Sequence, residues 1–76
     1  MSAIAVTVMR FPHPQWPVTV INCYHIALVR YNGEPLTHQI SHIDHATGHH
    51  DYVGWNKTEE AAIDRCRNLI EQGACQ

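Results

Sequence analysis

Apolar and β-branched residues form several runs in the first two thirds of the chain, and turn-forming residues separate them. Residues 3–11 predict a first strand. The segment 12–17 ends this strand, because its three prolines lack the backbone donor that a central ladder needs. Residues 18–31 give the strongest strand signal and predict one long strand, which we expect to bend or bulge near Asn22.

Two further strands follow from the turn signals. Asn32-Gly33 suits a two-residue type I′ hairpin turn, so residues 34–44 are predicted to return as a third strand. Residues 45–48 form the next predicted turn, and residues 49–55 the fourth strand. The predicted sheet is therefore an antiparallel four-stranded meander.

The last third of the chain changes to a helical period. Thr58 is the expected N-cap, Glu59 and Glu60 lie in the first turn near the positive end of the helix dipole, and Gly73 ends the helix. Its single apolar stripe consists of Ala62, Ile63, Cys66, Leu69 and Ile70. The predicted fold class is α+β, with the meander packed on one face by this single C-terminal α-helix. We expect Trp55 to pack under the start of the helix.

The predicted long strand is apolar on both sides, although one helix can cover only one face of a sheet. One side would carry Val18, Val20, Tyr24, Ile26 and Leu28. The other would carry Thr19, Ile21, Cys23, Ala27, Val29 and Tyr31. Either a second copy of the chain or a foreign protein covers the second face, or the strand twists and both halves enter one core.

Composition limits the chain to one domain, residues 1–76, with 45% hydrophobic and 16% charged residues. The formal net charge is −2 and the five bases are scattered, which argues against a dedicated nucleic-acid binder. Three cysteines are too few and odd in number for a secreted disulfide scaffold, and no long apolar run predicts a signal peptide or membrane span. We therefore expect a cytoplasmic protein with reduced cysteines and no membrane association.

Histidines cluster in the region of the third and fourth predicted strands. His42, His45 and His49 are the weak metal candidates there, but neither a CxxC nor an HExxH spacing accompanies them, so no metal or other cofactor is assigned. Cys23 and His25 would share a strand face, yet no third catalytic group accompanies them. Cys23 is expected to be a small core residue, and the chain is predicted not to be an enzyme.

Partner binding is the preferred interpretation, because rigid aromatic side chains dominate interface energetics. The residues predicted to contact a partner protein or a second copy of the chain are Trp16, His13, Tyr31, His42, His45, His49 and His50. The alternatives are a His-rich metal-binding domain and a nucleic-acid-binding domain that would use Lys57, Arg65 and Arg67.

The passage Gly54-Trp55-Asn56-Lys57-Thr58-Glu59-Glu60-Ala61 resembles the strand-to-helix junction of small phage and bacterial proteins. HicB-type antitoxins and some anti-CRISPR proteins with a sheet and one helix have a similar passage, and the likeness covers about 20 residues. The resemblance implies a non-enzymatic binding protein from a mobile element. The expected function is thus an inhibitor or regulator, of the anti-defence kind, that blocks the surface of a partner.

Overall fold

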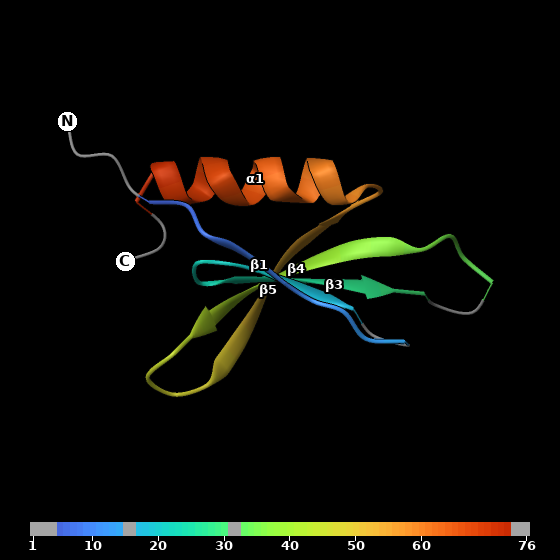
Figure 1. The fold of residues 1–76 in the computed structure, drawn as a ribbon, viewed down its shortest axis with the longest axis horizontal. Coiled ribbons are helices and arrows are strands. Elements are labelled where there is room, and N and C mark those ends of the chain that lie inside the picture. Colours follow the sequence, from blue (N-terminus) through green and yellow to red (C-terminus); the bar gives the residue numbers. More distant parts are fainter. Residues whose placement is uncertain (1–4, 15–16, 31–32, 74–76) are drawn as a thin grey trace.

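Five antiparallel strands and one helix form the fold in the computed structural model, which describes residues 5–14, 17–30 and 33–73 (Figure 1). The elements are β1 (Val8–Phe11), β2 (Val18–Ile21), β3 (Tyr24–Val29), β4 (Thr37–Asp44), β5 (His49–Asn56) and α1 (Glu59–Glu71). The strands lie in the order β1-β2-β3-β4-β5, so each pairs with its neighbour in sequence. The predicted α+β class, the antiparallel meander and the C-terminal helix are confirmed, with five strands in place of four.

The additional strand arises where the sequence predicts one long strand with a bend. Ile21 pairs with Tyr24, so Asn22 and Cys23 form a two-residue turn and the chain reverses there. Asn22 has a φ of 52°, a left-handed conformation that asparagine tolerates better than most residues. The predicted single strand 18–31 is therefore a hairpin of β2 and β3.

This hairpin also changes which residues share a face. Antiparallel pairing places Thr19 and Ile21 beside Ile26 and Tyr24, and these side chains lie on the face that α1 covers. The opposite face, which we call the open face, carries Met9, Phe11, Val18, Val20, His25, Ala27, Val29, Thr37, Gln39, Ser41, Ile43, His50, Tyr52 and Trp55. The predicted division of the two faces was wrong, because it assumed an uninterrupted period of two through Asn22.

The side chain of Asn22 also ties the N-terminal segment to the sheet. Its Oδ1 accepts a hydrogen bond from the backbone N–H of Thr7 at 2.9 Å, and its Nδ2 donates to the carbonyl of Ala5 at 2.9 Å. Regular pairing of β1 covers only Val8 to Phe11, whereas the prediction began at residue 3. The Asn22 side chain therefore holds residues 5–7 against the sheet, together with the Asn22 backbone N–H, which donates to the Thr7 carbonyl at 3.4 Å.

The turn residues predict the β4–β5 connection better than the β3–β4 connection. The last pair of β3 and β4 joins Val29 to Thr37, so the two strands are further apart in sequence than a two-residue type I′ turn at Asn32-Gly33 requires, and Asn32 itself lies outside the described residues. The turn at 45–48 is as predicted. Gly48 has a φ of 75° and donates its N–H to the carbonyl of Asp44 at 2.7 Å.

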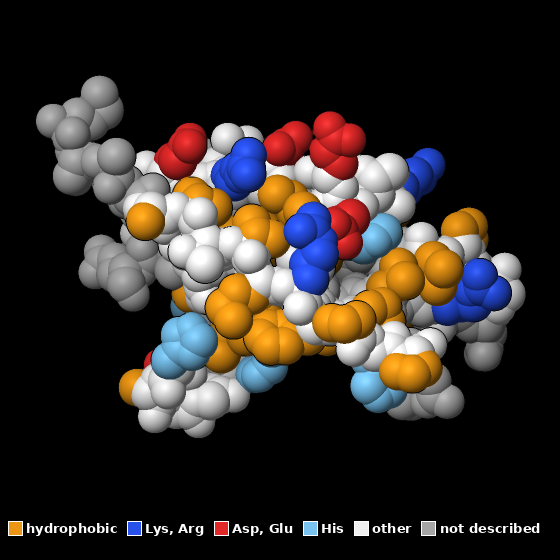
Figure 2. Space-filling view, viewed as in Figure 1, with side chains coloured by type: hydrophobic (Ala, Val, Ile, Leu, Met, Phe, Trp, Pro, Cys, Tyr) orange, Lys and Arg blue, Asp and Glu red, His pale blue; other side chains and the backbone are white. Residues whose placement is uncertain are grey.

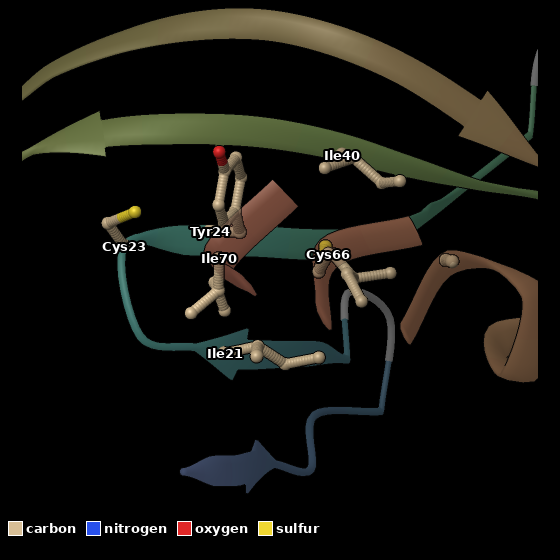
Figure 3. Packing of buried hydrophobic residues seen from close by; sticks show 8 residues of the cluster. Ile21, Cys23, Tyr24, Ile40, Cys66 and Ile70 are labelled. Carbon is tan, nitrogen blue, oxygen red and sulfur yellow. The ribbon is translucent and has the colours of Figure 1, made fainter. Parts of the chain in front are cut away.

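Helix α1 begins as predicted, with the Thr58 hydroxyl accepting the N–H of Ala61 at 3.2 Å. Its stripe of Ala62, Cys66 and Ile70 is fully buried against the sheet. On the sheet side this core contains Ile21, Cys23, Tyr24 and Ile40, which Figure 3 labels, and also Ile26. Burial raises the pKa of the Cys66 thiol to about 11, so the thiol is neutral in the core.

The cysteines depart from expectation in one respect. Cys23 is buried, as predicted for a small core residue, but it is also disulfide-bonded, whereas Cys66 is a free thiol. Disulfides persist mainly in oxidising compartments, so this bond does not fit the expectation of reduced cysteines. Within residues 5–14, 17–30 and 33–73, no helix is both long enough and apolar enough to cross a membrane.

Candidate functional site

The open face exposes large hydrophobic side chains to solvent. Met9 is 51% exposed, Phe11 50%, Tyr52 62% and Trp55 50%, and Leu36 in the loop before β4 is 43% exposed. Figure 2 shows most charged side chains on the helix side of the molecule, with hydrophobic side chains and histidines toward the sheet. A small domain that exposes this many large apolar side chains on one sheet face presents a candidate interaction surface.

Two of these aromatic residues come together through a β-bulge in β5. Tyr52 and Trp55 are three residues apart, and in a regular strand they would point to opposite faces. The pairing of β4 with β5 shifts between Ile40 and Ser41, so Val53 is an extra residue, and Tyr52 and Trp55 both lie on the open face. The expectation that Trp55 packs under the start of the helix was therefore wrong.

A groove on the open face runs beside these two rings. It encloses about 630 Å³ and is lined by Glu34, Pro35, Leu36, Thr37, Gln39, Tyr52, Trp55 and Lys57. We call it the aromatic groove. Of its lining, Lys57 was predicted as a nucleic-acid contact. Tyr52 was missed because alternation alone cannot locate a bulge, and Leu36 was missed because it lies in the loop before β4.

Those predicted partner-binding residues that the structure describes do not form one cluster. Trp16 and Tyr31 lie outside the described residues, and His13 is exposed in the loop after β1. His42 is half-buried on the helix-covered face, where its ring meets that of Tyr24 edge to face at 5.3 Å. The other three, His45, His49 and His50, are exposed in the β4–β5 hairpin.

The hairpin histidines divide between the two faces of the sheet. His49 Nε2 lies 2.9 Å from Asp51 Oδ1, while the ring of His50 meets that of His25 at 5.4 Å on the open face. Across the part of the chain that the structure describes, no three His, Cys, Asp or Glu side chains are placed to hold one metal ion. The candidates His42, His45 and His49 are therefore not brought together as a ligand set.

The fold affects the protonation of His25 in β3. Burial in β3 lowers the pKa of His25 below its usual 6.5, because desolvation disfavours the charged ring, and the neighbouring His50 and His45 lower it further. Sequence reasoning had noted His25 only beside Cys23. Since Cys23 is disulfide-bonded, it offers no free thiol for a cysteine–histidine nucleophile.

The lowered pKa of His25 makes the stability of the fold depend on pH. Folding favours the neutral ring over the charged one. The part of the free energy of unfolding that depends on a neutral His25 is therefore fully present above pH 6.5, and it is lost as the pH falls from 6.5 through the lowered pKa. We expect urea unfolding between pH 7.5 and pH 5 to show a falling free energy of unfolding, and His25→Gln to flatten that fall. His13→Gln, a change in an exposed loop, is the control and should keep the wild-type slope. Equal slopes in all three proteins would contradict the assignment to His25.

The basic residues predicted to bind nucleic acid lie in different surroundings. The guanidinium of Arg65 lies over Gly54 of β5, where an added Cβ would stand 2.5 Å from its Nη1. Arg67 is two residues further along α1 and so does not face the same side of the helix. Lys57 lines the aromatic groove. These three residues form no continuous basic stripe.

Comparison with protein-family models, with curated proteins and with solved structures gave no match to this chain. The geometry of the open face and the aromatic groove is therefore the ground for a functional proposal.

Proposed function

We propose that the chain is a small non-enzymatic protein-binding module that uses its open face to occupy the surface of a partner. The observation that carries this proposal is the exposure of Met9, Phe11, Tyr52 and Trp55, about half or more of each side chain, on the sheet face that α1 does not cover. Burying such side chains favours association, because apolar surface is removed from water. Aromatic residues are also the usual energetic centres of interfaces.

The distribution of charge also supports the open face as the binding surface. The helix side carries most of the charged groups, and Arg10 Nη2 is paired with Glu59 Oε1 at 3.0 Å on the helix-covered side of β1. The centres of protein interfaces contain few charged residues, and the strand residues on the open face are likewise uncharged or histidine. An inhibitor or regulator of phage or mobile-element origin is the biological role that we attach to this surface, on the resemblance of residues 54–61 alone.

Affinity capture from a bacterial lysate, combined with sedimentation velocity, tests the proposal. The wild-type chain is compared with Phe11→Ser, which changes the open face, and with Arg67→Ser, which changes the exposed side of α1. We expect Phe11→Ser to lose the captured protein and Arg67→Ser to keep it, with both variants retaining the wild-type melting temperature.

Two results count against this function. Capture that survives Phe11→Ser and also survives a second open-face change, Met9→Ser, would remove the open face as the binding surface. Sedimentation as a stable dimer that both open-face variants convert to a monomer would show instead that a second copy of the chain covers this face.

A further inference from the structure

We propose that His25 and His50 form a two-histidine site on the open face for a divalent transition-metal ion of the Zn²⁺ or Ni²⁺ class. Their imidazole rings come from β3 and β5, and the ring centroids lie 5.4 Å apart with the ring planes at 80°. The site goes beyond the proposed function, because the chain alone binds the ion. Neither ligand is among the metal candidates that the sequence suggested, His42, His45 and His49.

The sheet brings the two rings together from strands that are not neighbours. His25 pairs with Ser41 of β4, and His50 pairs with Ile43 of the same strand, so β4 lies between the two histidines. Neighbouring strands lie about 4.8 Å apart, which separates the backbones of β3 and β5 by roughly 9.6 Å. Rings that are only 5.4 Å apart therefore lean toward each other over β4.

The separation of the rings matches that of two imidazoles which share one tetrahedral ion. A zinc ion lies about 2.0–2.1 Å from an imidazole nitrogen and so about 3.2 Å from the ring centroid, and a tetrahedral angle then separates the two centroids by about 5.2 Å. The observed separation is 5.4 Å. Rotation about χ2, a torsion with broad minima in histidine, turns one nitrogen of each ring toward the shared ion.

The donor atoms and their surroundings select the class of ion. Imidazole nitrogen suits Zn²⁺, Ni²⁺ and Cu²⁺, whereas Mg²⁺ and Ca²⁺ require oxygen ligands, mainly carboxylates and carbonyls. The strand residues beside the two rings on the open face carry neither a carboxylate nor a thiol; they are Val20, Ser41, Ile43 and Tyr52. Two nitrogen donors without an acidic neighbour therefore favour a transition metal over Mg²⁺ or Ca²⁺.

Two positions of a tetrahedral ion remain open at this site. His45 in the β4–β5 turn lies close enough for its charge to act on His25, but among the described residues no three such side chains are placed to hold one ion. Structural zinc sites have four protein ligands, whereas a site with open positions binds water or a donor atom of another molecule. We therefore expect reversible binding of one ion per chain.

Isothermal titration of the full chain with nickel, zinc or magnesium chloride at pH 7.5 tests this proposal. We expect about one equivalent of Ni²⁺ or Zn²⁺ per chain, and no binding of Mg²⁺. His50→Gln changes an exposed residue and should weaken Ni²⁺ binding by about tenfold or more, since even groups that only orient a metal ligand contribute about 10–100-fold. His25→Gln should weaken binding to the same extent. Metal-free melting curves establish that both variants fold, and His50→Gln decides alone if His25→Gln does not.

His49→Gln is the matched control. His49 is the residue before His50 in β5, is also exposed, and lies on the opposite face of the sheet. This variant should bind Ni²⁺ within about twofold of wild type. Zinc should also raise the urea midpoint of the wild-type chain and of His49→Gln, but not that of His50→Gln, because an ion that binds only the folded state stabilises it.

Three results would overturn the proposal. Absence of stoichiometric uptake by the wild-type chain would show that the two rings make an ordinary edge-to-face contact. Equal losses in His49→Gln and His50→Gln would place the ion at the tip of the hairpin. Unchanged binding in a folded His25→Gln would remove β3 from the site. None of these results bears on the proposed function, whose test depends on Phe11 and Met9 and needs no metal.

Discussion

Ile40→Ala is expected to lower the free energy of unfolding by about 3–4 kcal/mol and the melting temperature by roughly 12–30 °C. Ile40 is fully buried at the centre of the core, where it pairs with Ile26 on one side and with Gly54 on the other. Gly54 has no side chain that could move into the space left by the lost atoms. The cavity would therefore persist, and its cost would add to the lost burial of the side chain.

This loss is large against the total stability of so small a domain. A chain of 76 residues typically has a free energy of unfolding of about 4–11 kcal/mol. Ile63→Ala is the matched control, because it deletes the same atoms from a half-buried position on α1, where alanine also favours the helix. Urea unfolding should give a loss of about 1 kcal/mol or less for Ile63→Ala. Similar losses in the two variants would show that Ile40 is not at the centre of the core.

The helix and the sheet class could be predicted because their signals are local. Thr58 caps α1 with its own side chain, the apolar stripe repeats along one face, and Gly73 adopts a φ of 83° after the last turn. The turn at 45–48 is local as well, since Gly48 bonds to Asp44 within the same loop. In each case neighbouring residues contain the interactions that fix the structure.

The chain reversal between β2 and β3 could not be predicted from local signals. Neither glycine nor proline marks it, and the partners of the Asn22 side chain are about 15 residues away, at Thr7 and Ala5. The bulge at Val53 was equally hidden, because it depends on how β5 pairs with β4. The aromatic groove follows from this bulge, so the candidate site was the least predictable part of the molecule. The partner-binding role and the likeness to phage proteins stay predictions.

Asn22→Ala is expected to lower the free energy of unfolding by about 2–3 kcal/mol, from two separate causes. Alanine pays about 1 kcal/mol or more to hold a φ of 52°, since its Cβ disfavours the left-handed region. It also removes both hydrogen bonds to residues 5–7, which are exposed and therefore contribute at the lower end of about 0.5–1.5 kcal/mol each. Because these bonds hold the segment before β1, the amide of Thr7 should also lose protection against hydrogen exchange.

Two further substitutions separate these causes. Asn22→Gly tolerates the positive φ but loses both bonds, so it should cost about 1 kcal/mol. Asn22→Asp keeps an acceptor for the Thr7 N–H and tolerates the left-handed conformation, but it replaces the donor to Ala5 with a carboxylate oxygen that repels the Ala5 carbonyl. Urea unfolding should therefore show a larger loss for alanine than for glycine. Equal losses for alanine and glycine would mean that backbone conformation contributes nothing at this turn. An unchanged Thr7 exchange rate in Asn22→Gly would mean that the two side-chain hydrogen bonds do not hold the segment, and that the pairing of β1 with β2 and the bond from the backbone N–H of residue 22 to the Thr7 carbonyl suffice.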